Sequence, residues 1–392
     1  MGDAVIVSAA RTAIGTARKG TLVDVSAFDL AKYTIAETLK RSGIPGSEVD
    51  DIVLGEVLQG GGDIARYAAV ELGLTEVPGV AHNRHCASGM AAVQTAAASV
   101  RAGMDKVVIA GGAEALSSMP SVMKRRLGTD EVGPWASPSH PDTPDAPAFD
   151  MSITVGWNTA QRANVTREEM DAWACESHRR AIAAIDEGRF EEEIFPIEVT
   201  RRDGETVVFQ VDEHPRRGTT MEKLAALKPI HPEIEGFSIT AGNSSGLNDG
   251  AASMMIVDSD YAHANGLTPL AVVKSWASAG VPPADTGLGP TLAIPKALAR
   301  AGLSAGDVDL VEINEAFASM AVASSRILGF DHEIVNVSGS GCSLGHPIAC
   351  TGARMIVTLV HELRRRGGGL GVASMCAGGG MGSATVVEVL PG

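Results

Sequence analysis

Short runs of apolar and β-branched residues alternate along the chain with longer, alanine-rich stretches of helical period. The runs expected to form strands begin at Val5, Asp51, Lys106, Leu270, Asp309, Glu333 and Ala384. The stretches expected to form helices are Phe28–Ser42, Ser88–Ala102, Arg167–Glu187, Thr291–Ala301, Ala316–Leu328 and Thr351–Arg366. A glycine, a common helix end, directly follows most of them. The alternation predicts an α/β fold built of packed layers.

The two ends of the chain carry a weak internal repeat. The stretch EVDDIVLGE, which ends at Glu56, matches DVDLVEINE, which ends at Glu315, in its acidic start, its apolar run and its final glutamate. Further along, each half reaches a turn that opens an alanine-rich helix, at Cys86 in the first half and at His346 in the second. Each then runs into a glycine-rich strand end. The pattern predicts a duplicated α/β unit.

A segment of different composition separates the halves. It holds the proline-rich stretch GPWASPSHPDTPDAP, a charged amphipathic helix and the basic stretch HPRRGTTMEKLAALK. Such an insertion either binds a ligand or mediates contacts between subunits. We expect an N-terminal half of residues 1–118 plus 249–268, an inserted loop domain of residues 119–248, and a C-terminal half of residues 269–392.

Composition and charge narrow the possible functions. The 392 residues are 45% hydrophobic and 20% charged, which is typical of a globular protein too long for one ordinary core. The formal net charge of -15 argues against nucleic-acid binding, which normally uses a basic surface. A phosphate-bearing ligand would therefore have to meet a local basic cluster.

The N-terminus and the cysteine content indicate an intracellular protein. MGDAVIVSAARTAIG reads as a buried strand and a turn, not as a basic leader followed by a long apolar run. No uninterrupted apolar stretch is long enough to span a bilayer, and five cysteines in a chain of this length do not make a disulfide framework. We expect a cytoplasmic location without membrane insertion.

Cys86 stands in HNRHCASGM, directly before a predicted helix. Unpaired backbone N–H groups and the positive end of the helix dipole favour the thiolate of a cysteine in such a position, which suits a nucleophile. An inert packed cysteine fits the segment equally well. A metal site made of His82, His85 and Cys86 matches no familiar zinc spacing.

Three further segments carry candidate chemistry. His346 lies on a glycine-rich turn and could polarise a thiol or a carbonyl oxygen, or it could simply stabilise the turn. Cys376 precedes three glycines whose amides could converge on a developing oxyanion. The run GGGMG lacks the spacing of a dinucleotide-binding loop. Asn314, at a strand end, could hold a water, orient a histidine or cap a helix.

Taken together, the motifs NRHCASG, TAGNSSGLNDGAA, NEAF, GHPIACTGAR and CAGGGMG resemble, in order and spacing, those of the thiolase family. The resemblance runs from Val5 to the end of the chain. It implies a duplicated thiolase fold with two α/β halves stacked as five layers, αβαβα, and a loop domain inserted from the first half.

The resemblance also implies roles for individual residues. Cys86 matches the acylated nucleophile, His346 the activating histidine and Cys376 the proton-shuttling cysteine. Asn314 matches the residue that holds a water beside the histidine in one oxyanion hole, and the backbone amides of Cys86 and Gly378 match a second hole. The family's contacts to the acyl chain or to coenzyme A match Met151, Arg216, Leu227, Ala241, Ser245 and Phe317.

The activity that the resemblance implies is acetyl-CoA C-acetyltransferase, the reversible condensation of two acetyl-CoA molecules to acetoacetyl-CoA and CoA. It requires no cofactor and no metal, because coenzyme A is itself substrate and product, and it implies a homodimer or homotetramer. Arg216 and Arg217 would supply the local basic cluster that the nucleotide phosphates require.

Three alternatives remain open. One is a degradative 3-ketoacyl-CoA thiolase for longer chains in fatty-acid β-oxidation. Another, a decarboxylating ketoacyl-synthase-type enzyme, would not use Cys376. The third, a non-catalytic acyl-CoA or lipid carrier, would have no reason to keep Cys86, His346 and Cys376 together.

Several positions depart from the usual family pattern. The turn before His346 reads SGSGCSLGHP, including Cys342, where NGGAIALGHP is more usual, and Cys350 replaces a small, unreactive residue. Asp150 and Gly156 stand where a histidine and a glutamate are expected. These departures leave the chemistry intact but make the preferred acyl length uncertain. Cys175, within a predicted helix, is expected to be inert packing.

Overall fold

The computed structural model describes residues 2–390, and ten strands of this range form one mixed sheet. Nine of them follow one another in the order β12 (Leu310–Ile313), β13 (Gly369–Ala377), β14 (Met381–Val389), β11 (Ala271–Gly280), β1 (Ala4–Arg11), β10 (Asn248–Asp258), β5 (Val107–Ala115), β3 (Asp51–Gly55) and β4 (Gly79–His82). The short strand β2 (Gly15–Thr16) pairs with β10.

The sheet consists of two similar halves joined by a very short ladder. Strands β1 and β11 pair only at Val5 with Val272 and at Ile6 with Ala271. From this seam outward, each half has two antiparallel pairings followed by a parallel one, through β1, β10, β5 and β3 on one side and β11, β14, β13 and β12 on the other. The repeated order confirms the predicted duplication, including the correspondence of β3 with β12.

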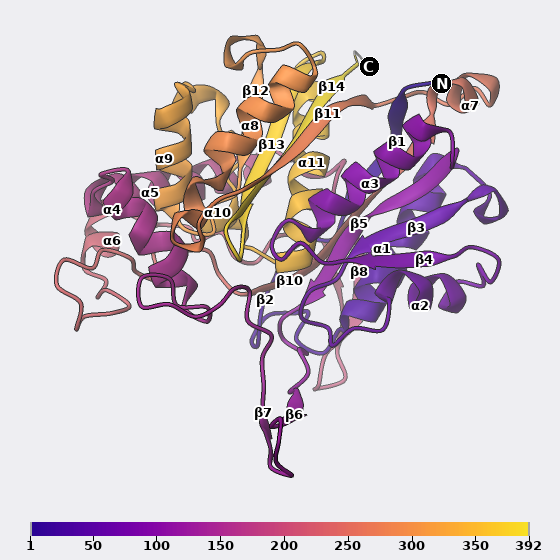
Figure 1. Ribbon diagram of the computed structural model, residues 1–392. Coiled ribbons are helices and arrows are strands. Elements are labelled where there is room, and N and C mark those ends of the chain that lie inside the picture. Colours follow the sequence, from indigo (N-terminus) through magenta and orange to yellow (C-terminus); the bar gives the residue numbers. More distant parts are fainter. Residues whose placement is uncertain (1, 391–392) are drawn as a thin grey trace.

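Helices complete the layers on both faces (Figure 1). The helices α3 (Ser88–Ala102) and α11 (Ile348–Arg365) contact each other and strands of both halves, so they form the central layer. Helix α1 (Ala27–Ser42) covers the outer face of the N-terminal half, and α8 (Gly289–Arg300) covers that of the C-terminal half. The five layers are therefore α1, the N-terminal half of the sheet, α3 with α11, the C-terminal half of the sheet, and α8.

Two glycines allow the central helices to approach closely. A Cβ atom added to Gly89 in α3 would lie 2.5 Å from the carbonyl oxygen of Ala349, and one added to Gly352 in α11 would lie 2.6 Å from the backbone nitrogen of Met90. Backbone therefore packs against backbone, which any larger side chain would prevent. This contact brings the starts of α3 and α11 together, and each start follows one of the two predicted catalytic turns.

The inserted segment adds helices beside the C-terminal half and a hairpin that projects from the body (Figure 1). A π-helical stretch, Ser152–Trp157, runs into α4 (Asn158–Arg162). It is followed by α5 (Arg167–Asp186), the hairpin β8 (Ile197–Thr200) and β9 (Thr206–Phe209), and α6 (Met221–Ala225). The projecting hairpin is β6 (Met123–Arg125) with β7 (Val132–Pro134). The domain boundaries drawn from the sequence stay predictions.

The predicted helices occur with small shifts at their ends. Ser88–Ala102 is as predicted, and the left-handed glycines Gly43, Gly103 and Gly329 end their helices. Helix α9 (Ala318–Leu328) begins later than predicted because Phe317 is extended and forms a bridge with Ser244. The strand expected to begin at Glu333 does not form: His332–Ile334 is a 3₁₀ turn, and Val335 makes an isolated bridge to Val311. The elements not predicted include β4, β10, α2 (Ile64–Glu71), α7 (Ser259–Ala264), α10 (Gly341–Leu344) and the 3₁₀ turns Gly46–Glu48, Pro283–Leu288, Ala305–Asp307 and His332–Ile334.

Within residues 2–390, none of the helices combines the length and the apolar character that crossing a bilayer requires.

Candidate active site

Cys86 lies on the turn between β4 and α3, half-buried. The backbone N–H groups of Gly378 and of Cys86 itself approach its Sγ closely enough to lower the pKa of the thiol. The turn is fixed locally, since the Ser88 hydroxyl donates to the carbonyl oxygen of His85 and accepts from the N–H of Arg84. The two amides that the resemblance assigns to an oxyanion hole therefore converge on this sulfur.

The protonation state of Cys86 differs from the one expected. Burial raises the pKa of its thiol to about 11, although the N–H groups of Gly378 and Cys86 act in the opposite direction. The prediction that the helix terminus favours the thiolate is therefore wrong for the free protein. Desolvation of the sulfur is the largest influence on this pKa and outweighs the two N–H groups. A base is needed to activate this thiol.

Cys376 lies near the end of β13 and is fully buried. Its Sγ is 3.4 Å from the Sδ of Met320. Burial raises the pKa of the Cys376 thiol well above its ordinary value, and a negative charge on Cys86 acts in the same direction, so the two sulfurs are close enough to interact. The turn after β13 passes through Gly379 and Gly380 at φ of 85° and 82°, which brings the Gly378 amide to Cys86.

His346 is held by hydrogen bonds at its backbone and at its ring. Its N–H donates to Oδ1 of Asn248 at 3.0 Å, and its Nδ1 lies 2.7 Å from Oγ1 of Thr351. The Thr351 hydroxyl donates its only hydrogen to the carbonyl oxygen of Pro347 at 2.9 Å, so it accepts from Nδ1–H. The tautomer is therefore the one that leaves the Nε2 lone pair free, and Nε2 is buried without a protein partner.

Burial lowers the pKa of His346 to about 3, and the charge of Arg354 acts in the same direction. The imidazole is consequently neutral throughout the physiological range. A neutral ring with a bare Nε2 can accept a proton from a thiol.

Asn314 follows β12 and is completely buried, yet neither its Oδ1 nor its Nδ2 has a protein partner. It does not cap α9, whose N-cap is Phe317 and has no side-chain hydrogen bond. A buried amide normally finds partners, so Asn314 is suited to binding a water or a substrate oxygen.

Glu114, at the end of β5, is a site residue that the sequence analysis missed. Its carboxylate accepts from the backbone N–H of Ala349 at 3.1 Å and of Leu58 at 3.3 Å, and from the side chain of Gln59. Burial raises its pKa to about 7. It thereby ties the start of α11, just after His346, to the N-terminal half. The only sequence signal was an acidic residue within a buried, glycine-rich strand end.

Three of the predicted coenzyme A contacts, Arg216, Leu227 and Ala241, line one cavity of about 230 Å³. Arg217, His178, His214, Lys223 and Cys342 line it as well. Arg217 forms an ion pair with Asp186. The cavity wall thus combines cationic and apolar side chains.

The other three predicted contacts lie outside this cavity lining. Met151 and Phe317 pack against the apolar cluster that contains Cys376, and Phe317 also packs against a cluster that contains Leu224 of the cavity wall. The N–H of Ser245 donates to the carbonyl oxygen of Ala316 at 2.9 Å. Phe317 is therefore shared by the apolar surroundings of the cavity and those of the second thiol.

The departures from the family pattern have local explanations. A Cβ on Gly156 would lie 2.9 Å from the Phe317 ring, so a glutamate would not fit there with this ring position. Asp150 accepts from the N–H groups of Ser152 and Ile153, and His231 bonds to it at 2.8 Å. Cys350 is buried, and burial raises its pKa to about 12. Cys175, on α5, is partly exposed.

Among residues 2–390, no group of three or more His, Cys, Asp and Glu side chains is arranged to hold a metal ion.

The sequence matches the family model described as "Thiolase, N-terminal domain" over residues 4–260 and the one described as "Thiolase, C-terminal domain" over residues 267–389.

Two curated relatives match over almost their full length. An acetyl-CoA acetyltransferase of Escherichia coli K12 is 43% identical, covering 100% of this chain and 100% of the relative. A 3-ketoacyl-CoA thiolase of Bacillus subtilis strain 168 is 41% identical, covering 99% of this chain and 100% of the relative. The crystal structure of the Bacillus anthracis acetyl-CoA acetyltransferase has a TM-score of 0.90 at 40% identity, covering 100% of this chain and 99% of that one.

Proposed function

Since the chain belongs to the thiolase family, we propose that it is an acetyl-CoA C-acetyltransferase, which condenses two acetyl-CoA molecules reversibly to acetoacetyl-CoA and CoA. The observation that carries the proposal is the approach of the Gly378 N–H to Cys86 Sγ, which lowers the pKa of this thiol. It brings a half-buried thiol to the strand end that carries a second thiol, Cys376.

The first half-reaction acylates Cys86. Nε2 of His346 takes the thiol proton as the sulfur attacks the acetyl carbonyl carbon, and the carbonyl oxygen gains negative charge beside the amides of Cys86 and Gly378. The C–S bond to CoA then breaks, and the leaving CoA sulfur takes the proton of Cys376. The products are acetyl-Cys86, a protonated His346 and a Cys376 thiolate.

The second half-reaction uses the charges left by the first. The Cys376 thiolate removes a proton from the methyl carbon of a second acetyl-CoA, and the enolate oxygen is stabilised by protonated His346 and by Asn314. The enolate carbon attacks acetyl-Cys86, and the bond to Cys86 breaks to release acetoacetyl-CoA. His346 returns its proton to Cys86. Every proton is accounted for by two thiols and one imidazole, so the chemistry requires no cofactor.

The binding of coenzyme A is assigned to the cavity beneath α6. Arg216, Arg217 and Lys223 supply positive charge for its phosphates in a chain of net charge -15, and Leu227 and Ala241 supply apolar surface. Phe317, which packs against the apolar clusters of both this cavity and Cys376, is suited to contact the pantetheine arm. Met151 and Ser245 complete the proposed contacts at the acyl end.

The second candidate is a 3-ketoacyl-CoA thiolase acting on longer chains in fatty-acid β-oxidation. The Bacillus subtilis relative carries that name. Glycine at position 156 also removes a side chain beside Phe317, which would leave space if the ring moved. The acetyl-CoA C-acetyltransferase assignment is preferred because the Phe317 ring fills that space in the observed structure.

We also propose that the protein works in the cytoplasm as a homotetramer or homodimer. All five cysteines are free, and both thiols of the mechanism require a reducing compartment. The hairpin β6–β7 exposes Leu127 to 81% and Val132 to 61%. An isolated two-stranded hairpin is marginally stable in water, so a second copy of the chain is the proposed cover.

The function is tested by thiolysis of a ladder of 3-ketoacyl-CoA substrates, from four carbons upward, followed by loss of the substrate's absorbance. We expect the highest kcat/KM with acetoacetyl-CoA and a steady fall with chain length. A maximum at longer chains would replace the acetyl assignment by the second candidate. Absence of thiolysis with every member would contradict both thiolase assignments.

A further inference from the structure

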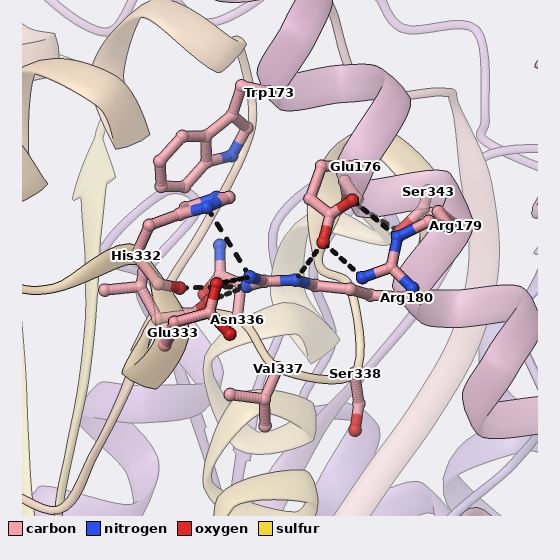
Figure 2. Close-up of polar contacts among 12 residues, drawn as sticks. Trp173, Glu176, Arg179, Arg180, His332, Glu333, Asn336, Val337, Ser338 and Ser343 are labelled. Carbon is pink, nitrogen blue, oxygen red and sulfur yellow. Dashed lines mark hydrogen bonds and ion pairs between the residues drawn. The ribbon is translucent and has the colours of Figure 1, made fainter. Parts of the chain in front are cut away.

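The segment from His332 to Gly345, which leads to His346, is held along its length by helix α5 of the inserted domain. Figure 2 shows Arg180 reaching from α5 to this segment. Its Nη1 donates to the carbonyl oxygens of His332 at 3.0 Å and Val335 at 2.6 Å, while its Nε donates to Glu176 at 2.7 Å. Beyond α5, Arg189 donates to the Ser338 hydroxyl at 3.1 Å.

The strongest attachment is a buried carboxylate, Glu315. It accepts four hydrogen bonds from neutral donors. We call Glu315, its four donor residues and Ser343 the Glu315 cluster. Two donors come from α5, Trp173 Nε1 at 2.9 Å and Ser177 Oγ at 2.6 Å, and two from the segment, Asn336 Nδ2 at 2.8 Å and the Cys342 N–H at 3.0 Å. Glu315 is 1% exposed, so these bonds are not shared with bulk solvent.

Ser343 extends the cluster toward the catalytic turn. Its Oγ lies 2.7 Å from that of Ser177. Because the Ser177 hydroxyl donates its hydrogen to Glu315, a hydrogen between the two serines can come only from Ser343, whose hydroxyl also lies 3.2 Å from the carbonyl oxygen of Ser340. The contact with Ser177 is the shorter of the two, and through it the chain of donors runs from Ser343 to Ser177 to Glu315. Ser343 occupies a position where the more usual turn sequence has an alanine, which could not donate.

Only two residues, Leu344 and Gly345, separate this serine from His346. Ser343 and Leu344 belong to the short helix α10, and Gly345 has a φ of 101°. A Cβ on Gly345 would lie 2.4 Å from the side chain of Asn248, the residue that accepts from the His346 N–H. The connection is therefore short and sterically confined, and a shift at Ser343 would move His346.

The same cluster borders the proposed coenzyme A cavity. Cys342, whose N–H binds Glu315, lines that cavity, and so does His178, the residue after Ser177 on α5. Glu315 itself directly follows Asn314. One set of hydrogen bonds therefore joins the cavity wall, the segment that ends at His346, and the turn that carries Asn314.

We propose that Ser343 and Ser177, acting through Glu315, are positioning residues. They hold the turn that carries His346 in a fixed position relative to the inserted domain. The proposal rests on the proposed function, because it assigns His346 the role of base. Neither serine touches the reacting atoms. Their effect is on how often Nε2 of His346 is within reach of the Cys86 thiol.

The test is the rate of the first half-reaction in Ser343→Ala and Ser177→Ala, measured by rapid quench and intact-protein mass after mixing with acetyl-CoA. We expect acylation of Cys86 to slow by about tenfold to a hundredfold, the size typical of a misplaced catalytic group, while KM for acetyl-CoA changes by less than about threefold. The matched control is Ser325→Ala, which removes a buried hydroxyl of α9 that has no hydrogen-bond partner among residues 2–390 and should stay within about twofold of wild type.

Two readouts separate positioning from general damage. In the serine variants the acylation rate should rise with pH, because an unassisted thiol reacts only as thiolate, whereas the wild-type rate should be flat between pH 6 and 8. The double variant Ser177→Ala/Ser343→Ala should be no slower than the slower single variant, since one hydrogen-bond chain is lost in each case. Circular dichroism and Tm identify a variant that fails to fold. The proposal is then tested with the other single variant.

The outcomes are distinguishable from failure of the proposed function. A wild-type protein that forms no acetyl-enzyme contradicts the proposed function itself. A wild-type protein that does so, with folded serine variants that match its rate and its flat pH profile, overturns only the positioning role. A change confined to KM, or an equal loss in Ser325→Ala, also overturns it.

Discussion

The two catalytic turns occupy equivalent places in a duplicated fold but are built differently. The turn with Cys86 precedes α3, and the turn with His346 precedes α11; the two helices meet at Gly89 and Gly352. Cys86 is half-buried, and the N–H of Gly378 reaches it from the other half of the molecule. His346 is buried, and side chains from two segments, Asn248 and Thr351, fix its backbone and ring.

The difference follows from the chemistry that each turn is proposed to perform. A nucleophile must be reached by a thioester, so its turn stays partly open. A general base must be neutral and present one nitrogen, so its turn is desolvated and its tautomer is fixed. Duplication supplied two similar positions, and the contacts around each position distinguish their roles.

Removing the sulfur of the open turn should have the largest effect. Cys86→Ala is expected to abolish the acetyl-enzyme completely, because no other half-buried thiol lies at this site. Intact-protein mass after mixing with acetyl-CoA measures the added acetyl group. Cys175→Ala, which removes a thiol on α5, is the control and should label as wild type. Persistent stoichiometric labelling of the Cys86 variant would exclude this residue as nucleophile.

The second thiol should matter more for the second half-reaction than for the first. Cys376→Ser is expected to lower the condensation rate by about 10²–10⁴-fold, the usual contribution of a positioned acid–base group. Acylation of Cys86 should be partly preserved, since the nucleophile and His346 are unchanged. Steady-state condensation and single-turnover acylation are measured side by side. Full condensing activity in this variant would refute the assignment of Cys376.

The pH dependence of acylation compares the two turns directly. With a pKa of about 3, His346 is unprotonated above pH 5, so wild-type acylation should not change between pH 6 and 8. In His346→Ala the reaction depends on the thiolate of Cys86, whose pKa is about 11, so the rate should rise about tenfold per pH unit. A wild-type rate that falls below pH 6.5 would indicate a histidine of ordinary pKa.

Loosening the closed turn without removing its base should have the smallest effect. Thr351→Val deletes the acceptor for Nδ1–H, which allows the other tautomer and leaves a buried donor unpaired. We expect acylation to slow by about tenfold, with KM little changed, because the ring is still present. Thr351→Ser keeps the hydroxyl and should restore most of the rate. Equal losses in both variants would point to packing of the methyl group instead.

Much of the architecture was predictable from local patterns. The strand at β12 and the start of α3 follow from apolar runs and from an alanine-rich helix, and the repeat ending at Glu56 and Glu315 indicated the duplication. The start of α9 was predicted too early, because the extended conformation of Phe317 depends on its bridge to Ser244, which is distant in the sequence.

The supporting residues of the site could not be recognised in this way. Thr351 in the first turn of a helix and Glu114 at a strand end look like ordinary polar residues, and so does Ser343. Their partners, His346, Ala349 and Ser177, become neighbours only when the two halves and the inserted domain pack together. The departure at Gly156 likewise has its explanation in the ring of Phe317.

The sequence by itself determined which reactive groups the molecule has and in which order they follow, because periodicity, glycine turns and motifs are local properties of the chain. The tertiary structure alone decided that the Cys86 thiol is protonated and which nitrogen of His346 is bare. Both depend on burial and on hydrogen bonds between segments that are remote in sequence, and these arise only when the layers assemble.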